Sequence, residues 1–125
     1  MAYRYSTRLS NILVDAIILD MEKGALPPSL RILGVGGETL VTLPFESPLV
    51  KNRDAFSVEL SNPTTSLAVK DATASSAVLL NGDGEIVVSM DVGSATSNPE
   101  AELILSSTLI YKGGTVIVTS VKLLI

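Results

Sequence analysis

The feature that most constrains how this chain folds is a four-residue turn, Asn81-Gly82-Asp83-Gly84, set between two apolar runs. A type I′ turn needs a positive φ at both central positions, and Asn and Gly adopt such a φ at the lowest cost. Val78–Leu80 precedes the turn and Glu85–Met90 follows it, and both contain the aliphatic side chains that favour strands. The sequence therefore predicts a β-hairpin at this position.

A second turn, Lys112-Gly113-Gly114, joins two further apolar runs near the C-terminus, Ala101–Tyr111 and Thr115–Leu124. Successive side chains of a strand point to opposite faces, so every second residue shares a face. In the last run such a row consists of Ile117, Thr119, Val121 and Leu123. We expect a second hairpin whose last strand carries this row on one face.

Shorter segments bounded by Gly, Pro, Asn and Ser supply the other expected strands. These are Ser29–Leu33, Thr39–Leu43, Phe56–Leu60 and Leu67–Lys70. The expected irregular segments are the Gly34–Gly37 loop, an excursion from Pro44 to Asp54, and an inter-strand loop over Ala72–Ala77. With 46% hydrophobic and only 4% aromatic residues, the core must be aliphatic, which suits an all-β sandwich or small barrel of short strands. At 125 residues we expect one domain, residues 1–125.

One N-terminal α-helix is expected before the first strand. Ser6 or Thr7 can cap its start, and Lys23-Gly24, followed by Pro27-Pro28, ends it. Its apolar side chains cover well over half of the helix circumference, and its polar stripe is narrow. Two interpretations of this wide apolar arc stay open, which are packing against the sheet and contact with another subunit.

The residue types that most catalytic sites need are missing. The chain has no Cys, His or Trp, so it lacks Ser-His and Cys-His nucleophiles, an imidazole base and a zinc ligand set. The Gly34–Gly37 loop has no third glycine at Thr39 and does not open a helix, so it is not a dinucleotide site. Asn81–Glu85 begins like a calcium loop but lacks its glycine and bidentate glutamate. A catalytic carboxylate pair among Asp83, Glu85 and Asp91 is the alternative that remains. We expect no enzymatic activity, no cofactor and no metal.

Charge and hydropathy bear on the partners. The net charge is −4, and the nine Lys and Arg residues form no dense run, so the chain lacks the basic stripe that phosphate binding needs. Asp15 and Asp20 interrupt the apolar run Ile12–Met21, which is far shorter than the ~20 residues of a membrane span. The polar start Tyr3–Thr7 is unlike a signal peptide. We therefore expect no nucleic-acid partner and no membrane partner.

The order of short motifs resembles a known family along nearly the whole chain. Towards the C-terminus these motifs are Asn81-Gly82-Asp83-Gly84, Val92-Gly93, Ser106-Ser107-Thr108-Leu109-Ile110 and the run from Gly113 to Ser120. Towards the N-terminus they are the helix start Arg8-Leu9-Ser10-Asn11-Ile12-Leu13, the strand Leu30-Arg31-Ile32, the Gly34–Gly37 loop and Leu40-Val41-Thr42-Leu43. In this order they resemble small tailed-bacteriophage virion proteins of the head decoration or cement type.

The resemblance implies a jelly-roll-like β-sandwich of short antiparallel strands with one N-terminal α-helix. It also implies a non-enzymatic protein that binds the outer surface of an assembled phage head and clamps the major capsid protein lattice. Such a protein is made in the cytoplasm of the bacterial host and ends in the virion. The alternatives are a carbohydrate- or receptor-binding β-sandwich module of a phage tail and a head–tail connector component.

The expected function needs contact surfaces rather than a catalytic site. We predict that the helix mediates self-association into a dimer or trimer, and that the excursion from Pro44 to Asp54 contacts the capsid shell. The candidate interface residues are Ile12, Val14, Ile18 and Met21 on the helix, and Phe45, Lys51 and Arg53 on the excursion.

Overall fold

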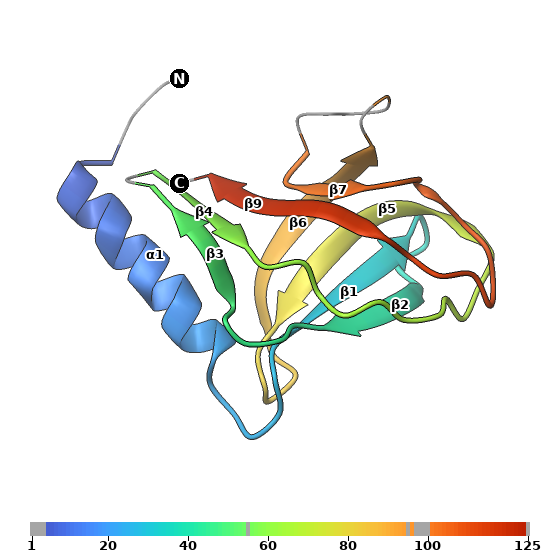
Figure 1. The fold of residues 1–125 in the computed structure, drawn as a ribbon, viewed down its shortest axis with the longest axis horizontal. Coiled ribbons are helices and arrows are strands. Elements are labelled where there is room, and N and C mark those ends of the chain that lie inside the picture. Colours follow the sequence, from blue (N-terminus) through green and yellow to red (C-terminus); the bar gives the residue numbers. More distant parts are fainter. Residues whose placement is uncertain (1–4, 55, 95, 97–100, 125) are drawn as a thin grey trace.

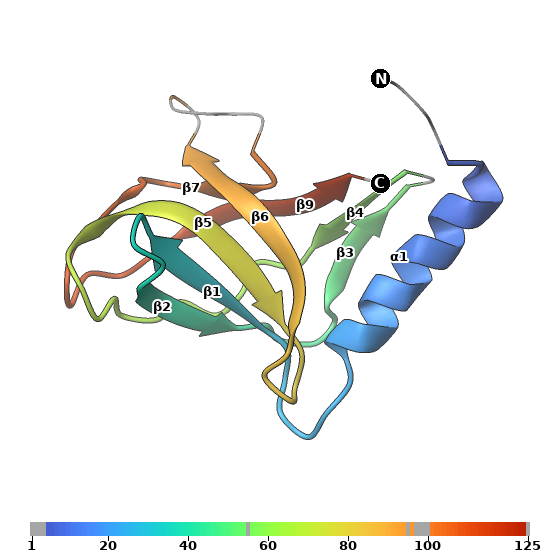
Figure 2. The same ribbon diagram turned by 180° about the vertical axis from the view of Figure 1, so that it is seen from behind.

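A computed structural model describes residues 5–54, 56–94, 96 and 101–124, and these residues form mostly β-strands with one N-terminal helix (Figures 1 and 2). The helix is α1 (Thr7–Met21). The strands are β1 (Ser29–Gly34), β2 (Thr39–Pro44), β3 (Val50–Arg53), β4 (Ser57–Leu60), β5 (Ala72–Leu80), β6 (Ile86–Ser94), β7 (Leu103–Leu105), β8 (Leu109–Ile110) and β9 (Val118–Leu124). The expectation of an all-β protein with one N-terminal helix is confirmed.

The strands form one curled sheet in the order β2-β1-β5-β6-β7-β9-β4-β3, with β8 beside β5. Most pairs are antiparallel, but β6 and β7 run parallel, with Val92 opposite Leu103. The expectation of antiparallel strands alone is therefore wrong at this pair. β6 pairs with β5 along its first residues and with β7 along its last three, so it belongs to both halves of the sheet.

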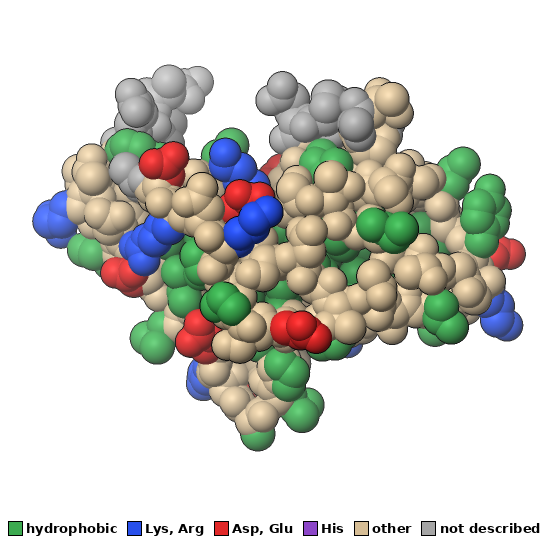
Figure 3. All heavy atoms as spheres, in the orientation of Figure 1, with side chains coloured by type: hydrophobic (Ala, Val, Ile, Leu, Met, Phe, Trp, Pro, Cys, Tyr) green, Lys and Arg blue, Asp and Glu red, His purple; other side chains and the backbone are tan. Residues whose placement is uncertain are grey.

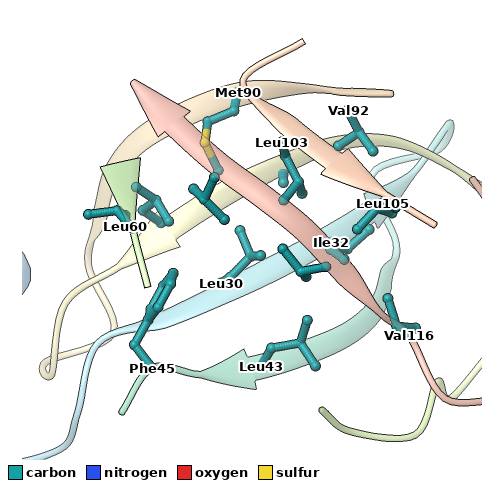
Figure 4. Packing of buried hydrophobic residues seen from close by; sticks show 14 of the residues in the cluster. Leu30, Ile32, Leu43, Phe45, Leu60, Met90, Val92, Leu103, Leu105 and Val116 are labelled. Carbon is teal, nitrogen blue, oxygen red and sulfur yellow. The ribbon is translucent and has the colours of Figure 1, made fainter. Parts of the chain in front are cut away.

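The core lies between the two halves of the curled sheet (Figure 4). Leu30 and Leu43 enter it from β1 and β2, and Leu60 and Leu103 enter it from β4 and β7. All four are 2% exposed or less. Phe45 is the buried aromatic side chain of this cluster, so aliphatic packing dominates, as the composition predicts.

Helix α1 begins and ends where the sequence predicts. The Ser6 side chain accepts a hydrogen bond from the Leu9 backbone N–H at 3.1 Å, which caps the first turn. Glu22 is the C-cap residue, and Gly24 follows with a φ of +103°. The helix lies at one end of the sheet beside β3 (Figures 1 and 2).

The β5–β6 hairpin is confirmed, but its turn is not of type I′. Gly84 has a φ of +80°, whereas Gly82, a central residue, does not have a positive φ. The Gly82 backbone N–H instead donates to the Lys23 carbonyl oxygen at 2.7 Å. A Cβ on Gly82 would lie 2.7 Å from that oxygen and would also overlap the Leu26 carbonyl oxygen. Gly82 is thus needed because the hairpin turn packs directly against the chain that leaves α1.

This contact predicts that Gly82→Ala lowers the free energy of unfolding by roughly 1–3 kcal/mol, because the new methyl group meets backbone atoms that cannot move alone. Gly84→Asn is the matched control, since open space surrounds Gly84 and Asn tolerates a positive φ. Urea unfolding of both variants measures the difference. Equal midpoints for the two variants would contradict the close approach.

The second predicted hairpin is only partly right. β7 and β9 do pair antiparallel, with Leu103 opposite Val121. The predicted turn does form, since the Gly114 backbone N–H donates to the Tyr111 carbonyl oxygen at 2.8 Å and Gly113 has a φ of +81°. It does not join β7 directly to β9, because β8 lies before it and pairs with β5. Thr119 is an extra residue in β9, since Ile104 lies opposite Ser120 and Leu105 lies opposite Val118. This bulge splits the predicted row, so Val121 and Leu123 are buried while Ile117 and Thr119 are exposed.

Three expectations for the middle of the chain are wrong. Ala72–Ala77 is the first part of β5 rather than a loop, because β1 pairs with it and Ala74 and Ala77 are buried. Val50–Arg53 is strand β3, paired with β4, rather than part of an irregular excursion. Leu67–Lys70 contributes a single bridge, from Leu67 to Thr115, rather than a strand.

Candidate interaction surfaces

The structure separates the seven predicted interface residues into buried and exposed groups. Val14 and Met21 are fully buried and Phe45 is 3% exposed, so these three fill the core of the chain itself and present almost no surface to a partner. Ile18 is half-buried and packs against the same core. The exposed members are Ile12, Lys51 and Arg53.

The outward side of α1 carries apolar side chains opposite its buried face. Ser10, Val14 and Met21 define the buried face. Ile12, Ala16 and Leu19, which we call the outer ridge, lie on the other side, and Ile12 and Leu19 are 48% and 76% exposed. The sequence predicted a wide apolar arc without indicating which part the sheet would cover. The structure decides that point, because β3 lies beside the helix (Figures 1 and 2) while Ile12 and Leu19 stay exposed.

Arg53 joins β3 to this helix. Its guanidinium donates to the Asp15 carboxylate at 2.6 Å through Nη1 and to the Asn11 carbonyl oxygen at 3.1 Å through Nη2. Lys51, on the same strand, makes a looser pair with Glu59 at 3.9 Å. Two of the predicted interface cations are therefore engaged within the chain, and Arg53 fixes the direction in which the outer ridge faces.

We predict that Arg53→Ala lowers the free energy of unfolding by about 0.5–1 kcal/mol. The ion pair with Asp15 is partly exposed, but its short distance makes it more stabilising than an ordinary surface ion pair. Lys51→Ala is the control and should have a smaller effect. Thermal unfolding in low salt and in 1 M NaCl measures both, and salt should reduce the loss for Arg53→Ala. A loss for Arg53→Ala no larger than that for Lys51→Ala would contradict this role.

A shallow groove of about 430 Å³ runs along the side of α1 next to the outer ridge. Leu13 and Ile17 line it from the helix, and Val87 and Leu124 line it from β6 and β9. Leu124 is 72% exposed. The apolar surface at this end of the molecule therefore extends from the helix onto the sheet, and the sequence did not indicate this because the lining comes from three distant segments.

A second apolar surface lies around β8, and we call it the distal cluster. It consists of large apolar side chains that are 53–66% exposed, namely Leu67, Val69, Leu109, Tyr111 and Ile117. The bridge from Leu67 to Thr115 and the hydrogen bond from the Gly113 N–H to the Ala68 carbonyl oxygen, 2.8 Å, hold these segments together. α1 lies at one end of the long axis and these segments lie towards the other (Figures 1 and 2).

The three candidate carboxylates do not converge at one point, because Asp91 lies far from Asp83 and Glu85. Asp83 and Glu85 lie in the β5–β6 turn, where the Asn81 side-chain oxygen accepts from their backbone N–H groups at 3.0 and 2.9 Å. Asp91 lies opposite Ser76, six residues along β6 from Glu85 and therefore roughly 20 Å away. Across the residues that the structure describes, no three acidic, His or Cys side chains gather into a possible metal site.

Within the same described ranges, no helix is long and apolar enough to cross a membrane. Comparisons with known protein families, with curated proteins and with solved structures find no match to this chain. Two exposed apolar surfaces, the outer ridge on α1 and the distal cluster around β8, are the features that bear on function.

Proposed function

We propose that this chain is a non-enzymatic virion structural protein of the head decoration or cement type. It binds the outer surface of an assembled phage head and stabilises contacts between neighbouring subunits of the major capsid protein. The sequence motifs supply the class of protein. The single observation that carries the mechanism is the separation of the outer ridge from the distal cluster along the long axis.

Two separated apolar surfaces suit a protein that joins neighbours. Full burial of one large aliphatic side chain contributes roughly 1.5–3 kcal/mol, so a few such side chains at each end give a useful contact. Ile117 and Leu109, at 53% and 58% exposed, have much of this area still to bury. Repetition of the contact over a lattice turns a modest affinity into a large collective stabilisation.

The charges of the chain fit the outside of a DNA-filled shell better than its inside. The net charge is −4, and the face seen in Figure 3 carries basic and acidic side chains interspersed, with no broad basic area. A DNA-facing surface needs cations that neutralise phosphates. We also propose that the strands are arranged as a jelly roll, as the resemblance implies. The curled sheet around one core supports this proposal.

One observation favours a second candidate, a carbohydrate- or receptor-binding module of a phage tail. Tyr111 is 66% exposed within the distal cluster, and exposed aromatic rings are the surfaces on which sugars stack. Tyr111→Ala separates the two functions. It should leave most of the shell binding intact, since four aliphatic side chains remain, but it should abolish stacking on a sugar.

The test of the proposed function mixes the protein with heads that lack it and measures the temperature at which the heads burst. We predict that the wild-type protein raises this temperature, and that salt changes the effect little because apolar burial drives the binding. Ile117→Lys should abolish the increase, because it places a charge in the distal cluster. Ile86→Lys is the matched control, since Ile86 is 64% exposed but lies outside both surfaces. An absence of binding by the wild-type protein, with bursting unchanged, would contradict the proposal.

A further inference from the structure

The outer side of α1 has charges of opposite sign at equal distances from its centre. Arg8, Ile12, Asp15, Leu19 and Glu22 follow one another at alternating steps of four and three residues, which places them in one row along the helix. Arg8 and Glu22 are exposed, and neither pairs with another charge among the residues described. Asp15 at the middle is already neutralised by Arg53 at 2.6 Å.

This row is complementary to itself when it is reversed. Arg8 and Glu22 each lie seven residues from Asp15, which is about 10 Å along a helix axis. Ile12 and Leu19 lie on either side of the same centre, and the small side chain of Ala16 beside it lets a second backbone come close. A twofold axis near Asp15 would therefore bring opposite charges together at both ends and apolar side chains together between them.

We propose that α1 pairs antiparallel with α1 of a second copy of this chain. Ile12 of each copy packs against Leu19 of the other, and Arg8 of each copy faces Glu22 of the other. This placement differs from the interface expected from the sequence, because Val14 and Met21 stay in the core and the outer ridge makes the contact. The pairing does not depend on capsid binding, so a failure of the proposed function leaves it standing.

A second copy fits this row better than other occupants do. A parallel helix would place Arg8 beside Arg8 and Glu22 beside Glu22, which costs free energy at both ends. Helix α1 is only about 22 Å long, so a single contact between two copies of it buries little surface. Stable interfaces bury at least ~1,200 Å². The isolated protein should therefore dimerise weakly and reversibly, and the high local concentration on a particle surface would favour the pair.

Charge reversal tests the antiparallel arrangement directly. Sedimentation equilibrium in low salt measures the dimer dissociation constant of wild type, Arg8→Glu, Glu22→Arg and the double variant. Each single reversal should weaken dimerisation about tenfold, because it turns two attractive contacts into two repulsive ones. The double variant should return to near the wild-type constant. Arg8 and Glu22 of one chain are about 21 Å apart along the helix, so the restoration cannot arise within a chain.

The single reversals should not weaken the fold. Arg8→Glu adds a negative charge to the first turn of α1 and Glu22→Arg adds a positive charge at its end, and both changes suit the helix dipole. Urea midpoints check this for every variant. Leu19→Lys should also weaken the dimer at least tenfold, whereas Ile86→Lys, outside the row, should leave it unchanged.

Four results would overturn the proposal. A wild-type protein that stays monomeric at millimolar concentration excludes the pair. A double variant as weak as the single variants indicates that Arg8 does not face Glu22 of the other copy. Association that Leu19→Lys leaves unchanged, or a mass that fits a trimer, places the contact on another surface.

Discussion

The structure depends on the change of partner within β6. The first residues of this strand pair antiparallel with β5, and its last three pair parallel with β7, so a single strand joins the two halves of the sheet. The sheet curls at this point, and Leu30 from one half meets Leu103 from the other across a shared core (Figure 4). This aliphatic core needs side chains from both halves of the sheet, because neither half can bury its apolar face alone.

The position of the surfaces follows from how α1 is attached to this sheet. The Gly82 N–H donates to the Lys23 carbonyl oxygen and so fixes the chain just after the helix. Arg53 fixes the middle of the helix by its ion pair with Asp15. These two attachments bury Val14 and Met21 and turn Ile12 and Leu19 outward. The path of β8 away from β9 exposes Leu109 and Ile117 at the other end. A partner on each side would then bury area that the fold itself leaves exposed.

Much of the local structure was predictable because local rules decide it. Local sequence decides the Ser6 helix cap, Gly24 after the helix, the loop at Gly34–Gly37 and the hairpin about Asn81–Gly84. Ala72–Ala77 has the sequence of a loop because Ala and Ser favour strands weakly, but pairing with β1 overrides that preference. The Thr119 bulge and the parallel pair of β6 and β7 depend on distant partners, which periodicity cannot indicate. The same holds for the surfaces, since Leu67, Leu109 and Ile117 meet only through the sheet.

Cryo-electron microscopy of heads saturated with this protein tests the central claim most directly, because it shows the partner of each surface. If the chain joins neighbours through its two apolar surfaces, density on the outer head surface will place Leu109 and Ile117 against the capsid lattice. Leu19 will then face away from the lattice, towards a second copy. Density confined to the tail or the connector, or a bound chain with the distal cluster open to solvent, would contradict this account.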